Sequence, residues 1–322
     1  MTPRLVFVHG IGGARDAAAE GAEWTRALAG AARDAGHAAA ISGLTGGWGA
    51  DVRFAAYGDL FRRRGAQGAG DTADGRDEED EAVLVALLLE AVDERLADAS
   101  LPPEELRALR SARAQLAPDR PGQGIGAPGR RAVNAVTSLL AVPGFRALGG
   151  WTSARTTAGT LGQVARYLNR REPDERGHTL DARIRARVAD CLDTEGPTVV
   201  VAHSLGTVVA LEALHRHSGP VPLLVTLGSP LGIRTAVLPR VRPQPVATPA
   251  CVGRWLNFWD RDDIVAARPL LEKFVRANAD GVLPRSTRVD ADGAWVHPAA
   301  KYLADGRVAG PVMEALARAV ER

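Results

Sequence analysis

Short apolar runs alternate with amphipathic stretches along much of the chain. The first run, Leu5–Val8, is rich in β-branched and aromatic residues and enters a glycine-rich loop, which predicts a buried strand. After residue 150, further apolar runs alternate with segments of helical spacing. Strands that alternate with helices in this way are typical of a mostly parallel sheet with helices packed against it.

The pattern predicts the following elements in addition to the first strand. Strands are expected at His37–Ser42, Val52–Tyr57, Thr198–Ala202, Pro222–Leu227, Arg254–Asp260 and Thr287–Val289. Helices are expected with Trp24, Ala27, Leu28 and Ala31 on one face, and at Leu161–Asn169, Leu180–Leu192, Leu205–His215, Arg268–Ala277 and Gly310–Val320.

The alternation is interrupted between about Arg62 and Gly150. The first part of this stretch has almost no large apolar residue, which predicts a mobile loop because little surface can be buried to offset the ordering entropy. A helix near Glu79–Ala99 is apolar almost all round, which indicates burial between other elements. We therefore expect residues 62–150 to form a helical cap, inserted into an α/β domain made of residues 1–61 and 151–322.

Length and charge limit the classes of protein to consider. A chain of 322 residues suits one large α/β domain with an insertion, or at most two domains. Its formal net charge of +2 is too small to indicate nucleic-acid binding. Cys191 and Cys251 lack the spacing of metal ligands and are expected to be reduced structural thiols. No secretory signal or transmembrane run of about 20 apolar residues is visible, so we expect a cytoplasmic protein.

The segment Ala202-His203-Ser204-Leu205-Gly206 joins an expected strand to an expected helix. This is the setting of a nucleophile elbow, in which a serine on a strained turn requires small residues two positions before and after it. The amides and dipole at the start of the helix would favour a developing negative charge. The alternative interpretation is that Ser204 merely caps the helix.

A serine nucleophile needs a general base and an acid that orients the base. In elbow-type enzymes these follow the serine in the order acid, then histidine. His215 and His217 lie on or just past the helix that follows Ser204, so position and elimination favour His297 as the base.

The acid is expected just past the strand that ends at Asp260. Asp260, Asp262 and Asp263 all lie there, and the residue pattern alone leaves the choice among them open.

The glycine-rich loop after the first strand predicts one half of an oxyanion hole. One amide of such a site follows the nucleophile, here Leu205, and the other comes from a loop near the start of the domain, here that of Ile11. His9 is expected to brace this loop rather than titrate during catalysis. Phosphate binding is disfavoured because the loop lacks the spacing of glycines and the Lys-Ser/Thr pair of nucleotide sites.

Several segments together resemble the lipase-like branch of the α/β-hydrolases, in particular class 3 lipases. They are Val6–Gly13, Val199–Leu214, Val225–Gly232, Asp263–Ala266 and His297–Tyr302. The early His-Gly loop is also similar to that of GPI inositol-deacylase-like hydrolases. The resemblance implies that Asp263, which opens an Asp-Ile-Val segment, is the catalytic acid. Ala202 and Ala266 depart from the lipase pattern but remain small.

The sequence therefore predicts an α/β-hydrolase fold and a serine hydrolase that cleaves a carboxylic ester of a small molecule or lipid. Ser204, His297 and Asp263 would form the triad, with no metal or organic cofactor. A thioesterase, an acyltransferase or a serine peptidase could use the same residues, because the fold alone does not separate these activities. A non-catalytic binding module is a different class, against which the presence of all triad residues argues.

Overall fold

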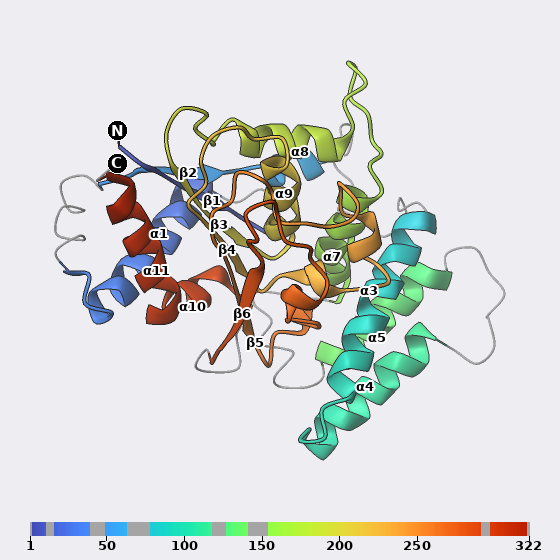
Figure 1. Cartoon of the computed structure of the whole chain (residues 1–322). Coiled ribbons are helices and arrows are strands. Elements are labelled where there is room, and N and C mark those ends of the chain that lie inside the picture. Colours follow the sequence, from blue (N-terminus) through green and yellow to red (C-terminus); the bar gives the residue numbers. More distant parts are fainter. Residues whose placement is uncertain are drawn as a thin grey trace.

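A six-stranded sheet forms the centre of the computed structural model, with the strand order β2-β1-β3-β4-β5-β6 (Figure 1). The strands are β1 (Arg4–Val8), β2 (Asp51–Ala55), β3 (Thr198–His203), β4 (Leu223–Leu227), β5 (Trp255–Asp260) and β6 (Pro284–Val289). Each neighbouring pair runs parallel. The structure describes residues 2–10, 16–38, 49–62, 78–117, 127–140, 154–290 and 297–320.

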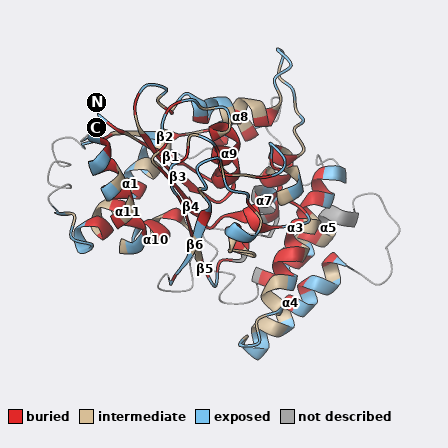
Figure 2. Cartoon of the chain, viewed as in Figure 1, coloured by how far each residue is buried: buried red, intermediate tan, exposed pale blue. Residues whose placement is uncertain are grey.

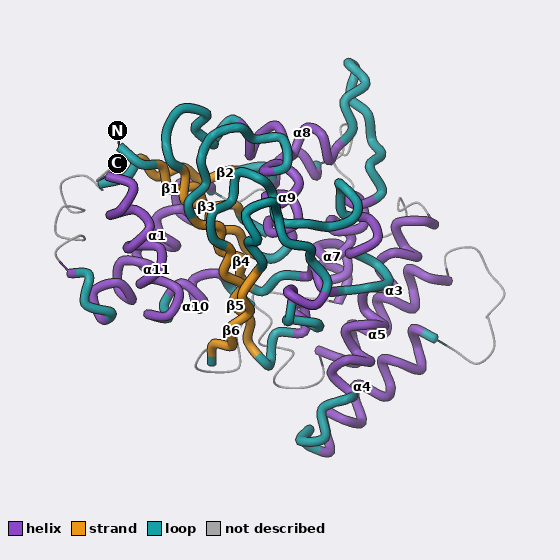
Figure 3. Tube along the Cα trace, in the orientation of Figure 1, coloured by secondary structure: helices purple, strands orange, loops and turns teal. Residues whose placement is uncertain are grey.

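Helices lie on both sides of this sheet, as Figure 3 makes plain. They are α1 (Ala17–Asp34), α3 (Glu78–Leu96), α4 (Pro103–Leu116), α5 (Ala127–Leu140), α7 (Ala154–Leu168), α8 (Leu180–Ala189), α9 (Leu205–Leu214), α10 (Ala299–Leu303) and α11 (Gly306–Val320). Short 3₁₀ turns include η3 (Pro230–Gly232), η5 (Ile264–Ala266) and η6 (Leu271–Lys273). The predicted alternation of strands and helices is confirmed over the described ranges. The strand expected at His37–Ser42 lies mostly outside them.

The two faces of the sheet are covered by different helices. In β1, Leu5 and Phe7 belong to a hydrophobic cluster with α1, α10 and α11, whereas Val6 and Val8 belong to a second cluster with α7, α8 and α9. Successive side chains of a strand point to opposite faces, so a strand that is apolar at every position is suited to burial on both sides. The central strands are accordingly buried throughout (Figure 2).

The helices of the 62–150 segment continue the second cluster. Leu84 and Leu88 of α3 and Leu109 of α4 belong to the same cluster as Val200 of β3. The expected burial of α3 is confirmed, because it packs against α4, α5 and α7 and against turn η5. Residues 63–77, expected to form a mobile loop, and residues 118–126 and 141–153 lie outside the described ranges.

One predicted helix is wrong. The structure holds only the short turn η6 within the segment Arg268–Ala277. The backbone of Arg276 instead donates to the carbonyl of Val246 and accepts from the amide of Thr248, each at 2.9 Å. These bonds to a distant segment compete with helical hydrogen bonds, and the spacing of apolar residues in the sequence does not reveal them.

Both cysteines are free thiols, as expected. Burial raises the pKa of Cys191, and it raises the pKa of Cys251 to about 11. Of the helices in the described ranges, none combines the length and the apolar character that a bilayer span requires.

Candidate active site

The carboxyl ends of the parallel strands bring the candidate residues to one edge of the sheet. Ser204 follows β3 directly and has a φ of 54° and a ψ of −130°, a conformation that non-glycine residues rarely adopt. Two close approaches surround this strained turn. A Cβ added to Gly206 would collide with the carbonyl oxygens of Val8 and His9, and one added to Gly10 would lie 2.5 Å from the Cβ of Ser204. The small residue required two positions after the serine is therefore explained by the backbone of β1.

Ser204, His297 and Asp263 form one chain of hydrogen-bonding contacts. The Oγ of Ser204 lies 3.1 Å from Nε2 of His297, and Nδ1 of His297 lies 2.9 Å and 2.8 Å from the two carboxylate oxygens of Asp263. All three are buried, with exposed fractions of 1%, 8% and 3% respectively. The 3.1 Å between Oγ of Ser204 and Nε2 of His297 is short enough for a proton to pass from serine to histidine.

Asp263 is held as a carboxylate by groups around it. Burial disfavours its charged form and raises its pKa, but the neighbouring His297, by charge and hydrogen bonding, and Tyr302 lower the pKa below its usual range overall. The hydroxyl of Tyr302 donates to Oδ2 at 2.7 Å, and the amide of Val265 donates to Oδ1 at 3.0 Å. These donors fix the orientation in which the carboxylate faces the imidazole.

The alternative acids and an alternative base lie elsewhere. Asp260 accepts from the backbone amide of Asp262 at 2.8 Å, and the exposed carboxylate of Asp262 pairs with Arg95 at 2.9 Å. His215, at the far end of α9, donates to the carbonyl oxygen of Ala247 at 3.0 Å. Among the three aspartates, therefore, the structure brings Asp263 to His297.

Of the two amides predicted to form the oxyanion hole, the structure describes only that of Leu205. Leu205 follows Ser204 directly and is the first residue of α9. The amides at the start of a helix have no partner within the helix, so the N–H of Leu205 makes no hydrogen bond inside α9. Ile11 lies outside the described residues, and its amide stays a prediction.

The loop that leads to Ile11 is braced by His9, in line with the sequence prediction. The amide of Tyr57 donates to Nε2 of His9 at 3.1 Å, so Nδ1 carries the proton and donates to the carbonyl of Gly10 at 2.8 Å. The imidazole also stacks on the ring of Tyr57, with 4.0 Å between centroids, and the tyrosine hydroxyl donates to the carbonyl of His9. Both ring nitrogens are thus engaged in holding the turn.

The contact made by His203 was not expected from the sequence. Its Nε2 donates to the backbone carbonyl of His297 at 2.6 Å, and the two imidazole rings lie 4.6 Å apart between centroids. The residue before Ser204 therefore contacts the backbone of the histidine that faces Ser204. No signal in the spacing of the sequence points to this contact.

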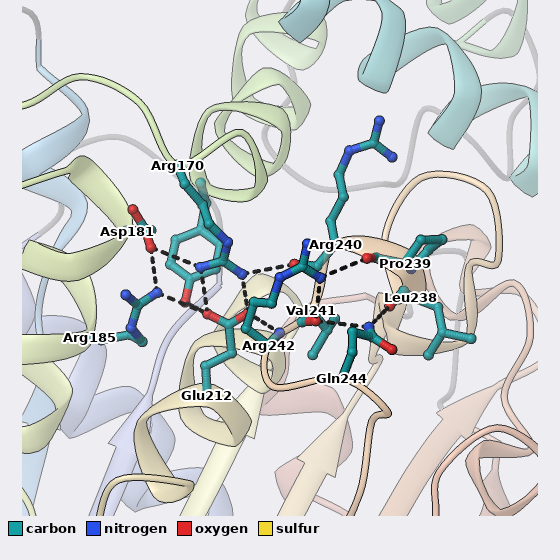
Figure 4. A network of polar contacts seen from close by, with 11 residues as sticks. Arg170, Asp181, Arg185, Glu212, Leu238, Pro239, Arg240, Val241, Arg242 and Gln244 are labelled. Carbon is teal, nitrogen blue, oxygen red and sulfur yellow. Dashed lines mark hydrogen bonds and ion pairs between the residues drawn. The ribbon is translucent and has the colours of Figure 1, made fainter.

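A buried polar network binds the end of helix α9 that lies away from Ser204 (Figure 4). Glu212 of α9 accepts hydrogen bonds from Arg170 at 2.5 Å, from Arg185 at 3.0 Å and from the backbone amide of Arg242 at 2.8 Å. Asp181 binds the same two arginines, at 2.8 Å and 2.6 Å. The far end of α9 is thereby tied to α8, to the segment before α8 that holds Arg170, and to the loop that holds Arg242.

A cavity of about 790 Å³ lies at the opposite edge of the sheet from Ser204. Its walls come from residues that precede β3, β4 and β5, such as Pro197, Pro222 and Arg254, and from α11. It includes none of the residues that surround Ser204. Within the described ranges, no three His, Cys, Asp or Glu side chains are grouped as metal ligands would be.

A parallel sheet with a serine on a strained strand-to-helix turn, facing a histidine and a carboxylate, defines the α/β-hydrolase class of fold. The family model described as the Alpha/beta hydrolase family matches residues 97–322, and the chain belongs to this family. No curated protein and no solved structure gives a significant match. The predicted fold class is therefore confirmed, and membership of the family supports a hydrolase scaffold for this chain.

Proposed function

We propose that this protein is a serine hydrolase that cleaves a carboxylic ester through an acyl-enzyme. The observation that carries the proposal is the continuous contact from Ser204 Oγ through the imidazole of His297 to the carboxylate of Asp263. The strained backbone of Ser204 supports it further, because such strain persists only where the surrounding structure enforces it and is concentrated at functional sites.

In the first half of the reaction, Ser204 Oγ attacks the acyl carbon and its proton passes to Nε2 of His297. Asp263 holds Nδ1–H in place and stabilises the imidazolium that forms. The amides of Leu205 and Ile11 are proposed to receive the oxyanion of the tetrahedral intermediate. The intermediate collapses, the ester C–O bond breaks, and the departing alcohol takes the proton from His297.

The second half repeats these steps with water. His297 removes a proton from a water molecule as the water oxygen attacks the acyl carbon of the Ser204 ester. The carboxylic acid leaves, and Ser204 recovers its proton from His297. Each group thus returns to its starting state, and the reaction requires no residue beyond those already named.

For the substrate, we propose an acylated small molecule or lipid. The segments that resemble class 3 lipases support this choice, and so does the position of α3, which packs against turn η5 directly after Asp263. Residues 62–150 are proposed to act as a cap that bounds the acyl site. A thioester, an amide or an acyl acceptor other than water would use the same nucleophile and is separated from this proposal by assay.

The test is covalent labelling with a fluorophosphonate, followed by mass spectrometry of the labelled peptide. We expect one adduct, on Ser204, in the wild-type protein and none in Ser204→Ala. A series of acyl esters of graded length, assayed beside an acyl thioester and a peptide substrate, then identifies the class of substrate. Ester hydrolysis in Ser204→Ala should fall by up to about 10⁶-fold.

A serine far from the site provides the control. Ser111 is exposed on α4, and Ser111→Ala should label and hydrolyse like the wild type. A wild-type protein that takes no label and cleaves no acyl substrate would instead be a binding module on a hydrolase scaffold.

A further inference from the structure

The loop after β4 and the loop after β5 run against one another at Asp263 and just beyond it. A Cβ added to Gly228 would lie 2.6 Å from Oδ2 of Asp263. Four residues on, a Cβ added to Gly232 would collide with the carbonyl oxygen of Arg268. The loop after β4 is thus in close contact with the carboxylate of Asp263 at Gly228 and with the backbone of Arg268 at Gly232, so the position of one loop constrains the position of the other.

Glu90 of helix α3 lies where the far ends of these loops meet. Its carboxylate accepts from the backbone amides of Arg234 and Thr235, each at 2.7 Å, and from the hydroxyl of Thr235 at 2.5 Å. The same carboxylate accepts from Nε of Arg268 at 3.0 Å. One side chain of the 62–150 segment therefore binds the loop after β4 and the loop that carries Asp263.

The surroundings of Glu90 favour its charged form. Its exposed fraction is 6%, and burial raises its pKa, but the hydrogen bonds from Thr235 and the two backbone amides, with the charge of Arg268, lower the pKa overall. A buried carboxylate with this many donors is costly to replace, because each donor left without an acceptor loses a hydrogen bond.

A second contact from α3 reaches the other side of the acid. Arg95 donates to the carbonyl oxygen of Arg261 at 3.1 Å and pairs with Asp262 at 2.9 Å. Helix α3 thus contacts the loop after β5 on both sides of Asp263: Arg95 binds the residues before Asp263, and Glu90 binds Arg268 after it.

We propose that Glu90 is a positioning residue: it fixes the two loops that aim Asp263 at His297, and so makes the alignment of the triad depend on the docking of helix α3. This inference rests on the proposed function, since it concerns the same site. Glu90 acts through the loops and touches neither the substrate nor the reacting atoms.

The experiment compares Glu90→Gln with Glu94→Gln. Glutamine keeps the shape of the side chain but removes its charge. It also places an N–H group where the surrounding groups are themselves hydrogen-bond donors. Glu94 lies on the same helix and pairs with the same Arg268, at 3.1 Å, so its variant tests loss of the ion pair alone. Each variant is assayed for kcat and KM with a short acetyl ester, for its rate of fluorophosphonate labelling and for its unfolding temperature.

For Glu90→Gln we expect kcat and the labelling rate to fall by about 10-fold or more, with KM for the acetyl ester little changed, because a shift of about 1 Å at a catalytic group can cost 10²-fold. The acidic limb of the kcat/KM profile should move to lower pH, since a displaced Asp263 stabilises the imidazolium less. Glu94→Gln should retain kcat and the position of that limb.

A lower unfolding temperature in Glu90→Gln, with kcat and the pH profile unchanged in the folded protein, would overturn the inference and leave a structural role. If Glu90→Gln does not fold, Thr235→Val decides, because it removes one donor to Glu90: a smaller fall in kcat with the same shift of the limb supports the inference, and wild-type values overturn it. A wild-type protein that takes no label overturns the proposed function itself, which is a distinct outcome.

Discussion

Nε2 of His203 donates a 2.6 Å hydrogen bond to the backbone carbonyl of His297. His203 is the last residue of β3, so the strand that ends at the elbow also holds the loop of the proposed base. The distance between Ser204 and His297 is thereby set from both sides, by the turn at Ser204 and by this contact.

His203→Phe should lower kcat by about 10- to 100-fold, because it removes the donor and lets the loop of His297 shift. His203→Gln can place an amide N–H near the position of Nε2, and we expect it to retain much more activity than the phenylalanine variant. The measurement is kcat with a short ester, at a temperature where both variants are folded. Equal activities in the two variants would argue against a role for this hydrogen bond.

The choice of acid is testable by single amide substitutions. Asp263→Asn should reduce turnover by about 10⁴-fold, because an amide favours the wrong tautomer of the histidine. Asp260→Asn and Asp262→Asn should cost far less, since their carboxylates face a backbone amide and Arg95. Turnover of the three variants with one ester decides among them. A severe loss in Asp260→Asn would shift the acid by three residues.

Asp263 should also make the stability of the fold depend on pH. Although burial raises its pKa, His297 and Tyr302 lower it overall below the ordinary value of about 3.9. The stabilisation is therefore fully present above about pH 3.9 and is lost as the pH falls through the lower value of the folded state. Urea unfolding should show that the gap in unfolding free energy between wild type and Asp263→Asn shrinks below about pH 4. A gap that widens there would contradict this assignment.

Gly228 leaves no room for a methyl group. Its φ is +53°, and an added Cβ would lie 2.6 Å from Oδ2 of Asp263 and 3.3 Å from Nδ1 of His297. Gly228→Ala should lower kcat by about 10²-fold and destabilise the fold by about 1–3 kcal/mol. Gly30→Ala in α1 is the control, because nothing lies within 4 Å of its added Cβ, and it should stabilise by up to about 1 kcal/mol. Kinetics and thermal unfolding of the two variants make the comparison.

Local signals in the sequence were sufficient for much of the fold. The run Leu5–Val8 is apolar at every position and Thr198–Ala202 is apolar after its first residue, and both are inner strands of the sheet. The expected short strand at Thr287–Val289 forms the end of β6. The predicted helix at Arg268–Ala277 failed because Arg276 pairs with the distant residues Val246 and Thr248. Such pairing depends on tertiary structure and leaves no periodic trace.

The candidate site divides in the same way. Ser204 and His297 could be selected from the strand-to-helix motif and the order of residues, and the structure brings them together, although their catalytic roles stay predictions. The support around them could not be predicted. The contact from His203 to His297 spans 94 positions and that from Glu90 to Arg268 spans 178, so neither can be found without the fold.

The buried network behind α9 limits how this chain can change over evolutionary time. Removing one member, such as Arg185, would leave Glu212 or Asp181 with an uncompensated charge, at a cost of about 3–5 kcal/mol. Exchanging the whole group for apolar side chains of similar volume is often neutral. Replacing one of these charged residues is therefore unfavourable, whereas replacing all of them at once is not. Descendants of this sequence should keep or lose the four together: Arg170, Asp181, Arg185 and Glu212.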